Sequence, residues 1–132
     1  MNDEELQTML IEYMGRGFLE NIIAMMKQDG GLLRFIPTML SDDAIVVRLG
    51  TTALVEELAR EHRQALVGIV PGLAALLGHE SPTIRGDAAN ALGIIGDPSA
   101  FGLLRELCHD ANPLVRDIAR EAVQEIEGSM SS

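Results

Sequence analysis

The sequence predicts an all-α fold, and three observations lead to that prediction. Of the 132 residues, 47% are apolar but only 3% are aromatic, and there is no tryptophan. A core of this kind must be built from aliphatic side chains, which favours closely packed helices. Apolar residues recur at the three-and-four spacing of one helical face, and no alternating run rich in Val, Thr and Tyr indicates a strand.

The first part of the chain is expected to form two helices. Asn2 or Asp3 can cap the first of them, the glycines of 15–17 should break the chain, and the DGG stretch at 29–31 should end the second helix. The apolar side chains of each helix share one face: Leu6, Met9, Leu10, Tyr13 and Met14 in the first, and Phe18, Leu19, Ile22, Ile23 and Met26 in the second.

The rest of the chain repeats itself. Three segments align on arginines spaced roughly 30 to 40 residues apart, within the range of repeat proteins: Arg48, Arg85 and Arg116. Apolar or small residues lie one position before each arginine and three, six, seven and ten positions after it, which makes one stripe of an α-helix. A shorter apolar segment precedes each of these helices. Each repeat is therefore a short helix, a polar turn and a longer helix.

These repeats define the expected organisation. We expect a single domain over 1–128, followed by a disordered tail at 128–132. Within the domain, the parts are an N-terminal cap or degenerate repeat and three repeats: 1–30, 31–64, 65–97 and 98–127. Pro82 and Pro113 suit the first turn of a helix, where a missing N–H group costs nothing.

The stretch ALGIIGDP, residues 91–98, has a glycine pattern that also occurs in phosphate-binding and RNA-binding loops. A phosphate loop needs a preceding strand and a lysine or hydroxyl side chain, and an RNA-binding loop needs basic neighbours. Here a helix comes before Gly96 and an aspartate follows it. We therefore interpret Gly96 as the left-handed residue that ends a helix, and Asp97 with Pro98 as the start of the next.

The segment SPTIRGDAANALGIIGDPSAFGLLRELCHDANPLVRDIAREAVQEI, residues 81–126, resembles HEAT repeats of the short type also found in phycobilin lyases. The resemblance is strong over this segment, fair over 32–66 and weak before Asp29. It implies a right-handed α-α superhelix, a HEAT-repeat solenoid of about three helix pairs plus N-terminal capping helices. The first full repeat departs from the pattern, with Gly50-Thr51-Thr52 where two alanines are usual.

The resemblance also implies roles for charged residues. Neighbouring HEAT repeats commonly stack an arginine and an aspartate as a ladder, and charge-assisted hydrogen bonds join the turns. In this sequence the arginines are preceded, five or six positions earlier, by an acidic residue: Asp42, Glu80 and Asp110.

Charge and composition restrict the partners. The net charge is −10 with a pI near 4.6, whereas nucleic-acid binding needs a positive surface. A DNA-glycosylase role, which requires a basic concave face, is excluded for the same reason. A protein with a basic surface is the more natural partner. The apolar stretches are shorter than the ~20 residues of a membrane span, and the acidic N-terminus lacks the layout of a signal peptide. The single Cys108 fits a reducing compartment, so we expect a cytoplasmic protein.

No constellation for catalysis or for metal binding is evident. His79 and the Cys-His-Asp run at 108–110 lie at equivalent turns, but neither CxxC nor HxxxH spacing supports a metal site. Serines 41, 81 and 99 are placed as helix caps, and none follows a nucleophile-elbow pattern. We expect no catalytic residue, no metal and no cofactor.

A binding surface follows from the resemblance, because the second helices of HEAT repeats line the concave side. Their outward positions are taken as one, five and eight residues after each arginine. With Asp87 added, the candidate binding residues are Glu56, Gly86, Asp87, Asn90, Gly93, Asp117, Glu121 and Gln124. A partner backbone can approach over Gly86 and Gly93, and its basic groups can meet the acidic residues. The alternative is that the glycines only ease crowding between helices.

The predicted function is a non-enzymatic protein-protein interaction module, an adaptor or scaffold. The alternative, from a different class, is a bilin-lyase-like chromophore attachment factor or an accessory subunit of a modifying enzyme. The methionines of the N-terminal third either pack in the core or form an adaptable surface for a second copy, which would give a homodimer. They are Met1, Met9, Met14, Met25, Met26 and Met39.

Overall fold

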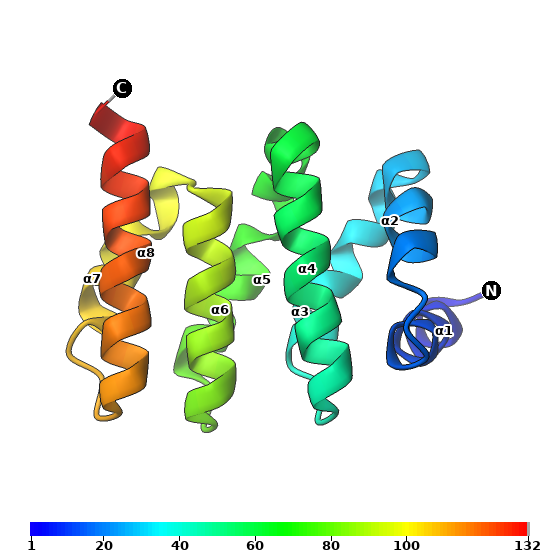
Figure 1. The fold of residues 1–132 in the computed structure, drawn as a ribbon, viewed down its shortest axis with the longest axis horizontal. Helices are drawn as coiled ribbons and strands as arrows, with labels where there is room; N and C mark the ends of the chain where they lie inside the picture. The colour runs from blue at the N-terminus through cyan, green and yellow to red at the C-terminus, as the bar shows by residue number, and fades with distance from the viewer. Residues whose placement is uncertain (132) are drawn as a thin grey trace. The chain divides into compact units, whose positions relative to one another are not determined.

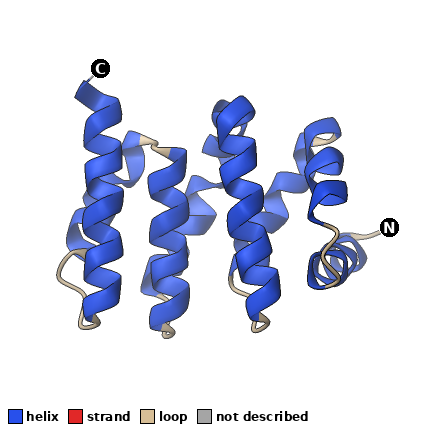
Figure 2. Ribbon diagram, in the orientation of Figure 1, coloured by secondary structure: helices blue, strands red, loops and turns tan. Residues whose placement is uncertain are grey.

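The structure is a computed structural model that describes residues 1–131, and within this range all regular elements are helices (Figures 1 and 2). The all-α prediction is confirmed. The chain divides into two compact units, Met1–Leu66 and Val67–Ser132. Their boundary lies close to the one expected between the first and second repeats. Each unit is described by itself below, and the single domain expected over 1–128 stays a prediction.

The first unit contains the N-terminal helices and the first repeat. Its elements are α1 (Asp3–Gly15), α2 (Leu19–Gln28), the 3₁₀ helix η1 (Gly30–Phe35), α3 (Ile36–Leu40) and α4 (Ile45–His62). Helix α1 begins with a capping box: the Glu5 N–H donates to Asn2 Oδ1 at 2.8 Å, and the Asn2 N–H donates to Glu5 Oε1 at 3.3 Å. Helices α1, α2 and α3 all contact α4, so α4 organises this unit.

The second unit contains two further helix pairs. After the 3₁₀ segment η2 (Arg63–Ile69), its elements are α5 (Val70–Ala75), η3 (Leu76–Gly78), α6 (Pro82–Ile95), η4 (Pro98–Ala100), α7 (Phe101–Leu107) and α8 (Pro113–Ser131). The two longer helices begin at Pro82 and Pro113, as predicted. Ser81 caps α6 by accepting the Ile84 N–H at 3.4 Å. Helix α6 packs against α5 and α8, and α7 packs against α8.

The predicted apolar stripes form the cores of both units. The side chains one before and three, six, seven and ten after each arginine are buried, except that Val123 is half-buried. They are Val47, Thr51, Leu54, Val55 and Leu58; Ile84, Ala88, Ala91, Leu92 and Ile95; and Val115, Ala119, Ala122, Val123 and Ile126. Thr51 is fully buried, and its hydroxyl donates to the Val47 carbonyl at 2.7 Å. This bond explains how the first repeat tolerates a threonine where alanine is usual.

The expected tail requires a correction. Residues 128–131 are helical, because α8 continues to Ser131, and residue 132 lies outside the described residues. Gly128 weakens a helix by only about 1 kcal/mol relative to alanine, and no proline follows it to end the helix.

The interpretation of Gly96 is confirmed. Its φ and ψ of 73° and 17° are left-handed, and its N–H donates to the Leu92 carbonyl at 2.9 Å. Asp97 then accepts the Ser99 N–H at 3.2 Å and starts η4. The glycine loop is a join between helices.

We expect Gly96→Ala to lower the free energy of unfolding by about 1–2 kcal/mol, because an L-residue is disfavoured in the left-handed region. Gly96→Asn should cost less, because asparagine tolerates this conformation. Urea unfolding of the three proteins measures both differences. Equal losses for alanine and asparagine would contradict the backbone explanation.

Candidate functional site

Two glycines of the predicted surface are buried between α6 and α8, which lie side by side in the second unit (Figure 1). A Cβ atom on Gly93 would lie 2.9 Å from Ala122 Cβ and 3.0 Å from Ala122 Cα. A Cβ atom on Gly86 would lie 3.0 Å from Ile118 Cδ1. The expectation that a partner approaches over these glycines is therefore wrong, and they instead allow the two helices to pack closely.

The error has a geometric cause. Positions one and eight after the arginine of α6 face the next helix of the array, and position five faces solvent, so Asn90 is exposed while the glycines are not. In α8 all three equivalent residues are exposed, because no other described helix of the second unit packs on that side. They are Asp117, Glu121 and Gln124. With Asn90, these residues make up what we term the α6–α8 surface.

The remaining predicted residues have different positions. Asp87 is half-buried on α6, so it contributes less to an open surface than Asn90 does. Glu56 is exposed on α4 in the first unit. Beside the α6–α8 surface, Arg120 Nη1 lies 3.4 Å from Asp117 Oδ1 in an exposed ion pair. The surface is thus acidic, although Arg120 partly neutralises the charge of Asp117.

An arginine ladder is present within the second unit. Arg85 binds Asp110 of the following repeat with two parallel contacts, Nε to Oδ1 and Nη2 to Oδ2, both 3.0 Å. These side chains are only 15% and 12% exposed. The hydrogen bonds from Arg85, and then the one from the Asn112 N–H, hold the pKa of Asp110 below its usual value. Arg85 therefore pairs with the next repeat and not with Glu80 of its own turn.

The recurring arginines share a second interaction, which the sequence did not reveal. Each directs Nη1 at two backbone carbonyls of its own turn, five and six residues earlier. These are Asp42 and Asp43 for Arg48, at 2.7 and 2.9 Å; His79 and Glu80 for Arg85, at 2.9 and 3.2 Å; and Asp110 and Ala111 for Arg116, at 2.9 and 3.3 Å. We call this interaction the carbonyl clamp. The constant spacing from turn to arginine was its only signal.

Comparison with known proteins gives a family for this architecture. A family model for HEAT repeats matches residues 33–124, most of the chain, including all three clamped arginines. The chain belongs to the HEAT-repeat family. The resemblance inferred from residues 81–126 is thereby confirmed.

The HEAT-repeat protein is also similar to individual proteins. It is 42% identical over 60 residues to mouse deoxyhypusine hydroxylase, a match covering 44% of this chain and 20% of that enzyme, so the chain spans about a fifth of this relative. Two solved structures share the fold. One is an engineered protein (TM-score 0.57, 21% identity, 74% of this chain and 46% of the other), and one is a designed armadillo repeat protein (TM-score 0.56, 19% identity, 95% and 59%).

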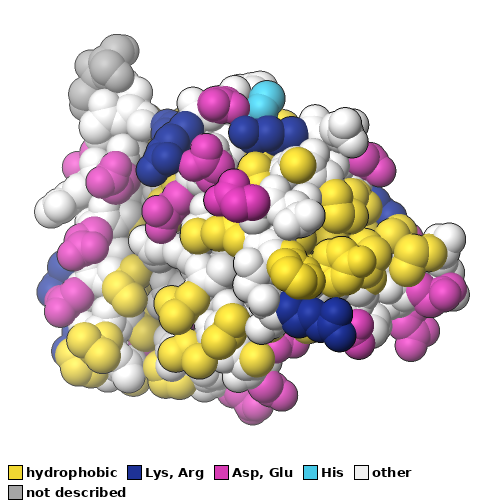
Figure 3. Space-filling model, turned by 45° about the vertical axis from the view of Figure 1, so that its right-hand side comes forward, with side chains coloured by type: hydrophobic (Ala, Val, Ile, Leu, Met, Phe, Trp, Pro, Cys, Tyr) yellow, Lys and Arg dark blue, Asp and Glu magenta, His cyan; other side chains and the backbone are white. Residues whose placement is uncertain are grey.

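Two exposed apolar residues of this HEAT-repeat protein, Ile45 and Val46, were missed by sequence reasoning, whereas Leu49, one position after Arg48, was among the expected outward positions. Ile45, Val46 and Leu49 in the first turns of α4 are 61%, 52% and 64% exposed. Figure 3 shows apolar and acidic side chains interspersed on the visible face of the molecule. The three residues precede or interrupt the buried stripe of α4, which was the signal available for finding them.

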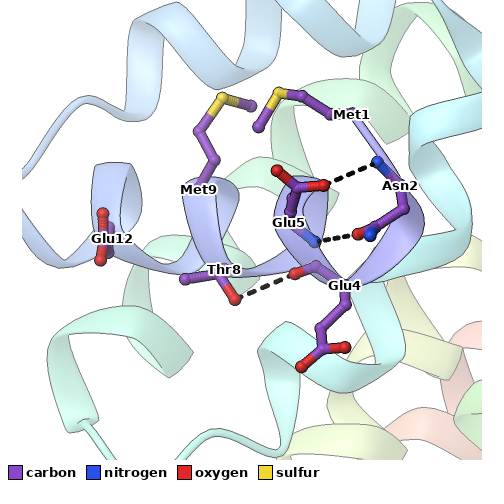
Figure 4. Close-up of a pocket in the computed structure, with 7 residues that line it drawn as sticks. All are labelled: Met1, Asn2, Glu4, Glu5, Thr8, Met9 and Glu12. Carbon is purple, nitrogen blue, oxygen red and sulfur yellow. Dashed lines mark hydrogen bonds between the residues drawn. The ribbon is translucent and has the colours of Figure 1, made fainter.

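A shallow hollow of about 400 Å³ runs along α1 (Figure 4). It is lined by Met1, Asn2, Glu4, Glu5, Thr8, Met9 and Glu12. Several of its polar groups already serve the helix: Asn2 and Glu5 form the capping box, and the Thr8 hydroxyl donates to the Glu4 carbonyl at 2.9 Å. These polar groups are therefore engaged in stabilising the first turns of α1.

The methionines of the N-terminal helices are divided between core and surface. Met14, Met26 and Met39 are buried, Met9 and Met25 are half-buried, and Met1 is exposed. Packing in the core therefore accounts for half of them, and the homodimer stays a prediction.

The turn residues considered as metal ligands have local roles. His79 Nδ1 accepts the Ser81 N–H at 2.9 Å, and the Cys108 thiol donates to the Leu104 carbonyl at 3.4 Å. Within residues 1–131, no group of three His, Cys, Asp or Glu side chains is arranged to hold a metal ion. In the same range, no helix is both long and apolar enough to cross a membrane.

Proposed function

We propose that this HEAT-repeat protein is an adaptor that binds a partner protein through the α6–α8 surface. HEAT repeats form an interaction scaffold, and their binding surfaces are made by helices stacked side by side. The observation that carries the proposal is the placement of Asn90 and Glu121. They occupy equivalent positions on neighbouring helices and are exposed, while the glycines and alanines beneath them hold the helices together.

The acidic balance supports a partner with basic groups. The net charge is −10, and Asp117 and Glu121 are both exposed on α8. Complementary charge across an interface raises the association rate and selects among partners. A rigid helical surface also loses little conformational entropy on binding.

A non-enzymatic role is part of the proposal, and the titratable groups support it. Strongly perturbed carboxyl groups mark either active sites or structural ion pairs. Here each carboxyl group with a lowered pKa is engaged by a cationic side chain that accounts for the shift. The pairs are Asp3 with Arg34, Glu61 with Lys27, and Asp110 with Arg85.

One observation favours a second candidate, an accessory part of a modifying enzyme. The similarity to deoxyhypusine hydroxylase reaches 42% identity over 60 residues, and the chain corresponds to about a fifth of that enzyme. Affinity capture followed by mass spectrometry separates the candidates. Capture of a non-enzymatic partner supports the adaptor, whereas co-purification with a modifying enzyme, or turnover of a bilin by the chain itself, supports the alternative.

The surface is tested by the double substitution Asn90→Arg with Glu121→Arg. We expect the captured partner to bind at least about tenfold more weakly, because a basic partner then meets two added positive charges. The melting temperature should hardly change, since both side chains are exposed. Isothermal titration calorimetry and thermal unfolding measure the two quantities.

A matched control changes the charge equally on other helices of the same unit. Ala75→Arg with Glu106→Arg alters exposed residues of α5 and α7 and should leave binding unchanged. Unaltered binding by the surface variant, or an equal loss in the control, would show that the partner binds elsewhere.

A further inference from the structure

Arg85 shows what an arginine of this array does when all three nitrogens of its guanidinium are hydrogen-bonded. Nη1 is held by the carbonyl clamp, and the opposite edge, Nε with Nη2, grips both oxygens of Asp110. This bidentate contact matches the planar guanidinium to a carboxylate. Arg85 with Asp110 is therefore an internal reference for the same residue in the next repeat.

Arg116 is that residue, and only its clamp is filled. Its Nη1 donates to the carbonyls of Asp110 and Ala111 at 2.9 and 3.3 Å. Among the described residues, no side chain bonds its Nε or Nη2. The side chain is half-buried, and the clamp fixes the guanidinium as it does in Arg85. Little rotamer freedom is left for a ligand to remove.

The local charges favour an anion at this edge. Arg85 and Arg116 both act on the carboxyl group of Asp110, and both contribute to its lowered pKa. Arg85 binds this carboxylate directly, whereas Arg116 acts on it through its charge alone. The neighbouring Asp117 is turned to Arg120, with which it forms an exposed ion pair. A second carboxylate at Arg116 would continue the alternation of Arg85, Asp110 and Arg116.

The surrounding residues indicate which kind of molecule supplies the carboxylate. Where α6 has Gly86 and Gly93 to admit a packed helix, α8 has the exposed Asp117 and Gln124. These longer polar side chains prevent a helix from packing on α8 as closely as α8 packs on α6. The Nε–Nη2 edge of Arg116 therefore suits a carboxylate carried by an exposed turn and not by a closely packed helix.

We propose that the Nε–Nη2 edge of Arg116 binds an aspartate or glutamate side chain from an exposed turn of the partner protein, as Arg85 binds Asp110. The proposal rests on the adaptor function for the existence of that partner. The partner would then carry an acidic residue that binds Arg116, in addition to the basic groups that face Glu121.

The test needs no partner. The Nε–H signals of the arginines are followed by ¹H–¹⁵N NMR while the full chain is titrated with N-acetyl-aspartate methylamide. The Arg116 signal is expected to shift and saturate, whereas Arg85, already paired, stays in place. Arg105, exposed on α7, reports non-specific ion pairing. The asparagine analogue of the probe is neutral and should shift neither signal.

Each contrary result overturns the proposal. An Arg116 response no larger than that of Arg105, or an equal response to the asparagine probe, excludes a carboxylate site. An Arg116 signal that shifts with protein concentration alone, together with dimers in sedimentation, assigns the edge to a second copy. In the same titration, the backbone amides beside Arg116 should also shift and saturate. Arg116→Lys retains the positive charge but not the planar guanidinium, so these amide shifts should disappear in that variant.

The failures of the two proposals are distinguishable. A negative titration removes the carboxylate site and leaves the adaptor function standing. Loss of partner binding on changing Asn90 and Glu121, together with a negative titration, shows that the partner uses the α6–α8 surface without Arg116.

Discussion

Replacing Asp110 with asparagine is expected to lower the free energy of unfolding at neutral pH by about 2–4 kcal/mol. The carboxylate accepts two hydrogen bonds of 3.0 Å from Arg85 and one of 2.9 Å from the Asn112 N–H. Asparagine can retain the bond from Asn112, but its amide cannot accept from both nitrogens of Arg85. The guanidinium, only 15% exposed, then lacks its counter-charge. Urea unfolding followed by circular dichroism measures the loss.

The stability lost on replacing Asp110 with asparagine is expected to depend on pH. Arg85 holds the pKa of folded Asp110 below the ordinary value of 3.8. The stabilisation is therefore complete above that value and is lost as the pH falls through the lower pKa of the folded state. The stability difference between wild type and variant should be constant above about pH 5 and shrink below about pH 4. An undiminished difference in strong acid would contradict the ion-pair explanation.

Asp117→Asn is the matched control for this pair. Asp117 and Arg120 are also an aspartate and an arginine in contact, but their side chains are 65% and 59% exposed. An exposed pair contributes about 0–1 kcal/mol, so this variant should be nearly as stable as the wild type. A loss as large as that of Asp110→Asn would mean that burial is not the decisive difference.

The second large effect concerns the contact between α6 and α8. Gly93→Ala should destabilise the protein by about 1–3 kcal/mol through overpacking, although alanine favours a helix by about 1 kcal/mol. The added methyl group would lie 2.9 Å from Ala122 Cβ and 3.0 Å from Ala122 Cα. The Cα atom belongs to the backbone, so no side-chain rotation relieves the contact. Thermal and urea unfolding measure the loss.

Two further variants isolate this cause. Gly102→Ala, in an exposed position of α7 with no heavy atom within 4 Å of the new Cβ, should leave stability equal or slightly higher. Gly93→Ala combined with Ala122→Gly should recover part of the loss, because the second change removes one of the clashing atoms. Equal stabilities of Gly93→Ala and Gly102→Ala would contradict the close approach.

The helices and their buried faces were predictable from sequence because both depend on local spacing. A helix turns every 3.6 residues, so the five apolar positions around Arg85 identify the buried side of α6 without knowledge of its neighbours. Gly96 with Asp97 was equally local, because one left-handed residue and one cap suffice to end a helix and begin the next.

The binding surface was less predictable because it depends on how one helix meets another. A row of small residues such as Gly86, Asn90 and Gly93 fits an open groove and a close helix contact equally well. Only the position of Ile118 and Ala122 against α6 distinguishes them. The carbonyl clamp was hidden for another reason, since its acceptors are backbone oxygens that every residue type carries.

The carbonyl clamp and the ladder give the recurring arginine two separate contacts, one within its repeat and one between repeats. The clamp joins an arginine to the turn of its own repeat, as in Arg116, whereas the ladder joins it to the repeat that follows, as in Arg85. Each clamped turn is therefore closed by atoms of its own repeat. Such an array can be lengthened or shortened by whole repeats, and each interchangeable unit keeps its own turn intact.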